Sequence, residues 1–336
     1  MLLGFWTFAY NVGRTLWTLD EYDVTERHFG LALGFFVVLT PLGLLLALDF
    51  VRPVFVHLPV TRTSVVGAHA TLAVFGAVLT TVLGALYQLS TMFTQTELHG
   101  IDHDLERVEE TAYPVGVLTL AGGRLGSVAP VATIGGVLVT VSVAAVGVVL
   151  GRRLLETRVE RTPMLSRYAV AAVSMVVWAV VTLPVWLRDP LAPATRFGPP
   201  GTTHLLSIGV VGFVVLGTLY HVVPFVVWVH RYSDLLGFED VPTIDDLYDD
   251  RVATADFVAV VVGGTGLVVA DLFPPVDNWT IAAGSLLVCG LLLFSWNLLT
   301  VLREHSPTSL AETVLPWLTT GRSVDTSTSD PDRPNE

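Results

Sequence analysis

The chain has 336 residues, of which 52% are hydrophobic and 14% are charged, and its formal net charge is −12. Several apolar runs exceed the ~18 residues that can cross a bilayer, so the composition argues against a soluble protein and predicts an all-α, polytopic transmembrane helix bundle. A single cysteine, Cys289, excludes a disulfide framework, and the acidic balance argues against nucleic acid as a partner.

In chain order, residues 1–28 begin with an aromatic-rich segment that is typical of a helix lying in the membrane interface. Residues 29–303 form the predicted transmembrane bundle in the lipid bilayer. Its seven predicted spans lie at about 29–50, 64–93, 128–150, 168–187, 198–231, 255–273 and 279–302. Residues 304–336 are rich in Thr, Ser, Asp and Pro, which predicts a disordered cytoplasmic tail.

Two segments decide the topology. Residues 112–126 contain Arg124 and four glycines and are too short to span unaided, but with support from neighbouring helices they would add an eighth crossing. The connection at 151–167 carries five arginines, which places it in the cytoplasm by the positive-inside rule. With seven spans, this orientation puts the N-terminus outside the cell membrane and the C-terminus inside.

An internal repeat relates the second and fifth spans when the chain is shifted by 133 residues. The shift lays Gly76, Gly84 and Tyr87 on Gly209, Gly217 and Tyr220. Each segment also has a histidine near its start, His69 in one and His204 in the other. Glycines at this spacing suit either close helix packing or a flat cofactor lying against the backbone. A histidine inside a membrane helix is costly without a partner, which favours a functional role.

The run HLLSIGVVGFVVLGTLYHVVPF resembles the tenth helix of haem-copper oxidase subunit I, most closely that of the C-family cytochrome c oxidases. The residues that fall in the family's places are His204, Gly209, Gly217, Tyr220 and Pro224. The segment around His69 is similar to the family's second helix, which supplies the other axial ligand of the low-spin haem. The resemblance therefore implies a haem b held by His69 and His204. Arg62 and Arg196 are the candidates to pair with its propionates.

The sequence also departs from the family. Thr202 stands where the family has the histidine that holds the high-spin haem, and no histidine lies between His103 and His204 to bind copper. The resemblance thus implies a truncated relative without copper, which would not reduce oxygen as an isolated chain. All 18 basic residues are arginines, and this lysine-free, acidic composition is similar to that of proteins from salt-loving archaea.

The pairing of the two histidines depends on the topology. If 112–126 crosses the membrane, His69 and His204 lie near the same membrane face. Otherwise the two helices run in opposite directions, and His221, about 17 residues or ~25 Å further along the helix, becomes the partner of His69. The remaining ionisable groups have simpler interpretations: His28 is interfacial, Tyr87 and Tyr220 are packing residues, and His99 and His103 belong to a solvated loop.

Three functions remain open from the sequence. The first is a haem b-binding protein that transfers electrons or senses a diatomic gas beside other respiratory-chain subunits. The second is a transporter, because a repeat on oppositely directed helices is typical of inverted-repeat carriers. The third is a haem-free scaffold or assembly subunit. The content of bound haem separates the first function from the other two.

Overall fold

The computed structural model describes residues 2–273 and 278–306, and within these ranges the chain is helical without any β-strand, as predicted. The helices are α1 (Leu2–Trp17), α2 (Val24–Leu48), α3 (Arg62–Thr71), α4 (Thr80–Thr94), α5 (Ile101–Leu125), α6 (Ala129–Leu155), α7 (Pro163–Arg188), α8 (Thr202–His204), α9 (Phe213–Tyr232), α10 (Asp250–Leu272) and α11 (Trp279–His305). The π-helical segment η2 (Leu72–Leu79) joins α3 to α4, and η4 (Leu205–Gly212) joins α8 to α9.

Seven of these helical units are long and apolar enough to cross a membrane. They are α2, α3–α4, α6, α7, α8–α9, α10 and α11, and they correspond to the seven spans predicted from the sequence. The chain is therefore a multi-pass membrane protein whose environment is a lipid bilayer.

The helix α5 explains the ambiguous segment at 112–126. This segment is the second half of a helix of 25 residues, and the loop predicted around His99 and His103 is wrong from residue 101 on, because residues 101–111 form the first half of this helix. Part of the polar face of α5 is covered by protein: Tyr113 donates to the carbonyl of Phe75 at 2.5 Å and Glu109 is fully buried, whereas Asp104 and Arg107 are exposed. Hydropathy does not identify such a helix, because a polar side chain that other helices cover scores the same as one in a loop.

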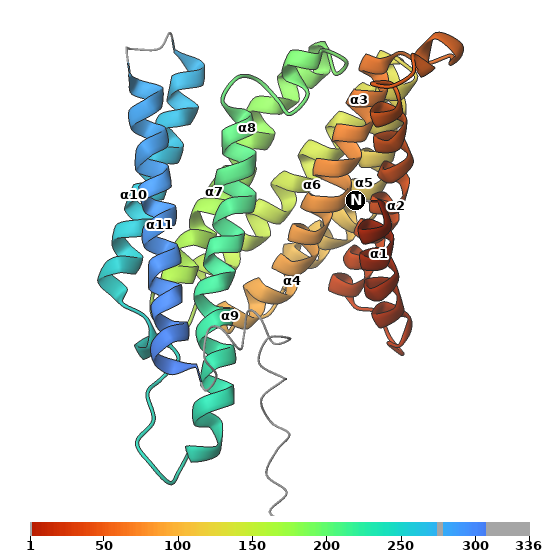
Figure 1. The fold of residues 1–336 in the computed structure, drawn as a ribbon. Helices are drawn as coiled ribbons and strands as arrows, with labels where there is room; N and C mark the ends of the chain where they lie inside the picture. Colours follow the sequence, from red (N-terminus) through yellow and green to blue (C-terminus); the bar gives the residue numbers. More distant parts are fainter. Residues whose placement is uncertain (1, 274–277, 307–336) are drawn as a thin grey trace, which may run out of the picture.

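Successive helices alternate in direction (Figure 1). In the packing of α2 on α3–α4, Gly84 lies against His28 and Gly76 against Phe35, so residue numbers rise in opposite senses. Because α5 also runs along the bundle, three helical units (α5, α6 and α7) lie between α3–α4 and α8–α9, and these two units run in the same direction. The two repeated units are therefore parallel, which differs from the oppositely directed helices on which the transporter hypothesis was based; the transporter function itself stays a hypothesis.

The alternation also fixes which segments share an end of the bundle. The start of α2, the end of α11 and the arginine-rich connection after α6 lie at one end, whereas the starts of α3 and α8 lie at the other (Figure 1). Seven helical units have the length and hydropathy of a membrane span, and α5 is a further helix that runs along them; the sides of the membrane that the two ends of the chain face stay a prediction.

The repeat extends to the whole bundle. The first half consists of α2, α3–α4, α5 and α6, and the second half of α7, α8–α9, α10 and α11. In the first half Gly84 lies against His28, and in the second half the equivalent Gly217 lies against Arg167. The two π-helical segments also fall on each other at the shift of 133 residues, since Leu72–Leu79 matches Leu205–Gly212.

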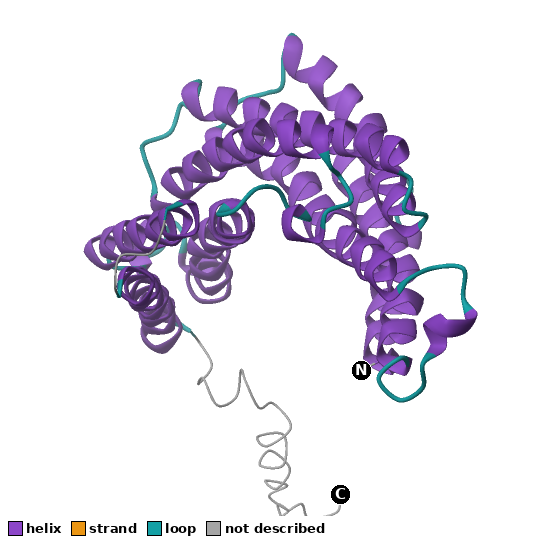
Figure 2. Cartoon of the chain, turned by 90° about the horizontal axis from the view of Figure 1, so that it is seen from above, coloured by secondary structure: helices purple, strands orange, loops and turns teal. Residues whose placement is uncertain are grey.

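The helices stand in an open arc when seen along the bundle (Figure 2). In Figure 1, α3–α4 and α8–α9 lie in front of α6 and α7, and the two views together place them on the concave side. The two units meet at one end, where the rings of Phe93 and His221 are 4.5 Å apart, and are separated at the end where α3 and α8 begin.

The terminal segments differ from the prediction in detail. The helix α1 packs on α2, where Phe5 and Phe8 contact Phe36. The helix α2 begins at Val24, where Asp23 caps its first turn, so His28 lies inside a span rather than in the interfacial segment 1–28. The tail predicted for 304–336 falls, from residue 307 on, outside the described residues.

Candidate functional site

His69 lies in the second turn of α3 and faces α2. Its Nδ1 is 3.1 Å from the carbonyl oxygen of Leu39, and a Cβ placed at Gly43 would come within 2.9 Å of the imidazole Cε1. The absence of a side chain at Gly43 therefore leaves the space that this ring occupies. An Nδ1–H donated to a backbone carbonyl fixes the tautomer and leaves Nε2 as the free lone pair.

His204 ends the short α8 and faces α10. Its Nδ1 is 2.8 Å from Oδ2 of Asp271, and the two side chains are 36% and 40% exposed. The π-helical segment η4 begins at the next residue, and η2 begins three residues after His69. Single turns of π-helix recur at functional sites in membrane and soluble proteins.

The two histidines share one feature of axial haem ligands. In the part of the chain that the structure describes, each ring has an acceptor at Nδ1, and neither Nε2 has a hydrogen-bond partner. Such an acceptor orients a ligating imidazole and increases its basicity. The parallel repeat also places both at the same end of the bundle, as the pairing of His69 with His204 requires.

Other observations limit this site. The two rings are held against different helices, α2 and α10, and the contacts of the structure do not join them. The cavity beside His204 has a volume of about 60 Å³, which is room for a few water molecules and not for a porphyrin. Of the two arginines expected at haem propionates, Arg62 is paired with Asp49 at 2.9 Å.

His221 lies 17 residues after His204 in the same helical unit, toward the end of the bundle where α9 ends. Its ring contacts Phe93 at 4.5 Å and stacks on Phe225 at 5.8 Å between centroids. His221 would replace His204 only if α3–α4 and α8–α9 ran in opposite directions. Because they run in the same direction, His221 lies far from the level of His69.

A buried polar network lies in the first half, between α2, α4 and α5. The carboxylate of Glu109 is 3.2 Å from Nε2 of His28 and accepts a hydrogen bond from the hydroxyl of Tyr87 at 3.1 Å. His28 is 1% exposed and Glu109 is fully buried. Ionisable side chains inside a membrane protein are costly and for that reason are paired, as these are.

The second half contains the equivalent network between α7, α9 and α10. The guanidinium of Arg167 forms an ion pair with Asp256, whose other oxygen accepts from the hydroxyl of Tyr220. Asn297 of α11 adds a hydrogen bond to that hydroxyl at 3.1 Å. The network therefore joins all four helical units of the second half.

The sequence interpretation missed both networks. His28 precedes an apolar run and was predicted to be interfacial, and the two tyrosines were predicted to be packing residues. The one signal present was the repeat itself, which equates Tyr87 with Tyr220. Glu109 and Asp256 could not have been found from the sequence, because their equivalence becomes visible only when it is known which helices pack together.

The solvated loop predicted around His99 and His103 is in part an ion-pair cluster. His99 contacts Glu156 at 2.7 Å, and this hydrogen bond holds the pKa of Glu156 below its ordinary value. Asp102 is fully buried and paired with Arg152 and Arg153, both at 2.7 Å. Among the described residues no group of three or more His, Cys, Asp or Glu side chains forms a metal site.

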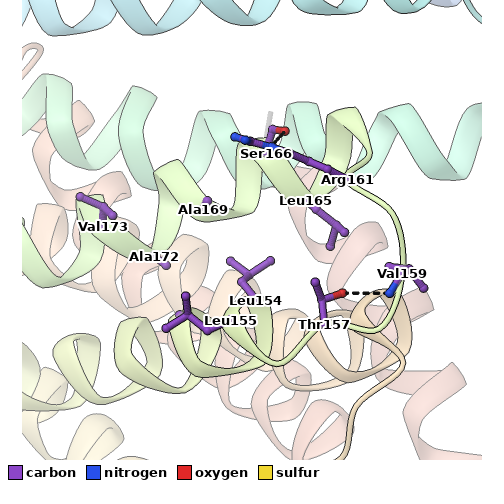
Figure 3. A pocket seen from close by; sticks show the side chains of 11 residues that line it. Leu154, Leu155, Thr157, Val159, Arg161, Leu165, Ser166, Ala169, Ala172 and Val173 are labelled. Carbon is purple, nitrogen blue, oxygen red and sulfur yellow. Dashed lines mark hydrogen bonds between the residues drawn. The ribbon is translucent and has the colours of Figure 1, made fainter.

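A further cavity, of about 530 Å³, lies between the end of α6, the start of α7 and the connection between them (Figure 3). Its lining is mostly aliphatic, and its polar groups include Arg161, which donates to Ser166 at 3.1 Å. No histidine or carboxylate lines it. This cavity therefore offers neither a haem ligand nor a proton-transfer group.

The fold and the two networks define a duplicated, multi-pass membrane protein with one buried carboxylate–tyrosine pair in each half. No family model, curated protein or solved structure matches this chain significantly. The resemblance to haem-copper oxidase subunit I rests on the residues of two helices.

Proposed function

We propose that this chain is a membrane protein that binds haem b through His69 and His204 and serves in single-electron transfer. The observation that carries the proposal is the shared state of the two imidazoles: each Nδ1 has an acceptor, and within the described residues each Nε2 is free. The two helices run in the same direction, and this supports the pairing because both histidines then lie near the same end of the bundle.

The chain's own residues would prepare the ligands. The carbonyl of Leu39 holds His69 in the Nδ1–H tautomer, and Asp271 does the same for His204 with a full negative charge, which makes its Nε2 the stronger donor. Bound haem would supply a one-electron iron couple.

We place the arginine-rich connection after α6 in the cytoplasm of the cell, by the positive-inside rule. Because the start of α2 and the end of α11 lie at that same end of the bundle, they would face the cytoplasm as well. The histidine end would then face the opposite side, where other respiratory-chain subunits would deliver or accept electrons.

The test is the reduced-minus-oxidised spectrum of the purified protein, recorded for the wild type, His69→Ala and His204→Ala. We expect a bis-histidine b-type spectrum in the wild type and its loss in both variants. His230→Ala is the matched control, since His230 lies at the far end of the same helical unit as His204 and has its Nδ1 on the carbonyl of Val226. Haem should be unchanged in this control.

Two results would contradict the proposal. A well-folded wild type without haem would remove electron transfer and leave the transporter or scaffold functions. Loss of the spectrum in His69→Ala but not in His204→Ala would show that His204 is not the second ligand.

A further inference from the structure

A small cavity lies at the histidine end of the bundle, between the start of α3, the end of α5 and the connection after α7. Its volume is about 80 Å³, and its polar lining consists of Thr61, Thr63, Ser64, Arg124, Ser127 and Arg196. No carboxylate lines it. Thr63 and Pro193 at its edge are exposed, so the cavity is open to the surface.

Arg124 gives this cavity a buried positive charge. The side chain is 5% exposed and donates to the carbonyls of Pro190 (3.1 Å) and Arg196 (2.9 Å) and to the hydroxyl of Thr71 (2.7 Å). All three acceptors are neutral. Two of the five guanidinium N–H groups remain available, and among the described residues no carboxylate lies within ion-pair distance of the charge. The guanidinium also lies over the ring of Trp186, 5.1 Å from its centroid, but within the described residues no anion balances its buried charge, so a counter-anion is expected.

Further donors face the same space. Arg196 is half-buried and lines the cavity, and within the described residues its guanidinium has no partner. The nearby acid Asp189 is occupied elsewhere, because its carboxylate accepts from the backbone N–H groups of Leu191 and Ala192.

The first turn of α3 adds backbone donors. The side-chain oxygen of Thr61 accepts a hydrogen bond from the N–H of Ser64, and its carbonyl oxygen accepts one from the N–H of Val65. The N–H groups of Arg62 and Thr63 form no hydrogen bond to described residues. Free N–H groups and the helix dipole favour an anion at this position. Two guanidinium groups, hydroxyls and these N–H groups together match an oxyanion.

We infer that this cavity binds one phosphate group, held chiefly by Arg124 and Arg196. The volume suits a single phosphate and excludes a macrocycle or a nucleobase. The position at the end of membrane-spanning helices favours the phosphate of a lipid headgroup, and free inorganic phosphate shares the same chemistry. The inference uses Arg196, which the resemblance assigned to a haem propionate, but it does not require bound haem.

The test counts bound phosphorus in purified protein after extended washing with phosphorus-free detergent. We expect about one phosphorus atom per chain in the wild type and its loss in Arg196→Gln and in Arg124→Gln. Arg188→Gln is the control, because Arg188 is an exposed arginine at the same end of the bundle that does not line the cavity. This control should keep the phosphorus.

Partition between chloroform–methanol and water separates the two sources: phosphorus in the organic phase identifies a phospholipid, and phosphorus in the aqueous phase identifies free phosphate. Either result supports the inference. Because Arg124 is buried, the Arg124→Gln variant can fail to fold, so the phosphorus content of Arg196→Gln is the deciding measurement. Equal phosphorus in Arg196→Gln and the wild type, or none in the wild type, would overturn the phosphate site without bearing on the haem spectrum.

Discussion

Each half of this protein joins an acid, a tyrosine and a basic side chain in one buried network, and the two networks differ in the basic side chain. In the first half a histidine, His28, contacts Glu109, and in the second half an arginine, Arg167, contacts Asp256. A tyrosine from the repeated helix bonds to the acid in both, and the cation lies beside the ring of that tyrosine in both. The two halves therefore share an arrangement of acid, tyrosine and basic group, with a histidine as the basic group in one half and an arginine in the other.

The difference decides where a proton can be. Arginine keeps its charge under all ordinary conditions, so the second pair is a fixed ion pair. In the first half, Nδ1 of His28 lies 2.7 Å from the carbonyl of Val24 and must carry a hydrogen to donate to it. Nε2 of His28 and the carboxyl group of Glu109 then share one proton between them, which sits either on the imidazole or on the carboxyl group. The first half can move a proton within its pair, and the second cannot.

The largest effect that tests this comparison is expected for Arg167→Gln. The substitution leaves the buried carboxylate of Asp256 without its cation, and breaking such a pair typically costs about 3–5 kcal/mol of stability. His28→Gln should cost clearly less, because Glu109 can take up a proton and stay hydrogen-bonded to Tyr87. Thermal unfolding of both variants in detergent measures the difference.

The control for this prediction is the double variant Arg167→Gln/Asp256→Asn, which removes both charges. It should recover part of the lost stability, since the uncompensated charge is gone. Equal destabilisation by His28→Gln and Arg167→Gln would show that the two pairs are equivalent and would break the comparison.

An intermediate effect is expected for the tyrosines. Tyr220→Phe removes a hydrogen bond to a buried charged group, worth about 1.5–3 kcal/mol, and also deprives Asn297 of an acceptor. Tyr87→Phe removes only the bond to Glu109 and should cost less. The midpoints of thermal unfolding of the two variants show which substitution destabilises the protein more. A larger loss in Tyr87→Phe would indicate that the first network is the more constrained.

The smallest effect on stability is expected for Asp271→Asn. The pair of Asp271 with His204 is more than one-third exposed, and exposed pairs contribute about 0–1 kcal/mol. If His204 holds haem iron, the same substitution should raise the haem midpoint potential, because a neutral amide makes the imidazole a weaker donor. A potentiometric titration beside the unfolding curve separates the two roles, and an unchanged potential would argue against ligation by His204.

The sequence predicted the apolar spans well because length and hydropathy depend only on local composition. It also predicted the repeat, since glycines and a tyrosine recur at fixed spacing in α3–α4 and α8–α9. It failed for α5, where Glu109 and Tyr113 face other helices, and no local signal distinguishes such a segment from a loop. This one helix adds a further pass along the bundle and thereby makes the two repeated units parallel.

By itself, the sequence determined that this chain is an all-α membrane protein with seven apolar spans and two histidines at the starts of repeated helices. Only the tertiary structure decided that the halves are parallel, that Glu109 meets His28 across 81 residues of chain, and that Arg124 has only neutral partners among the described residues. Contacts between residues so distant along the chain cannot be predicted from the local sequence, because a buried charged side chain meets its partner only when the helices pack.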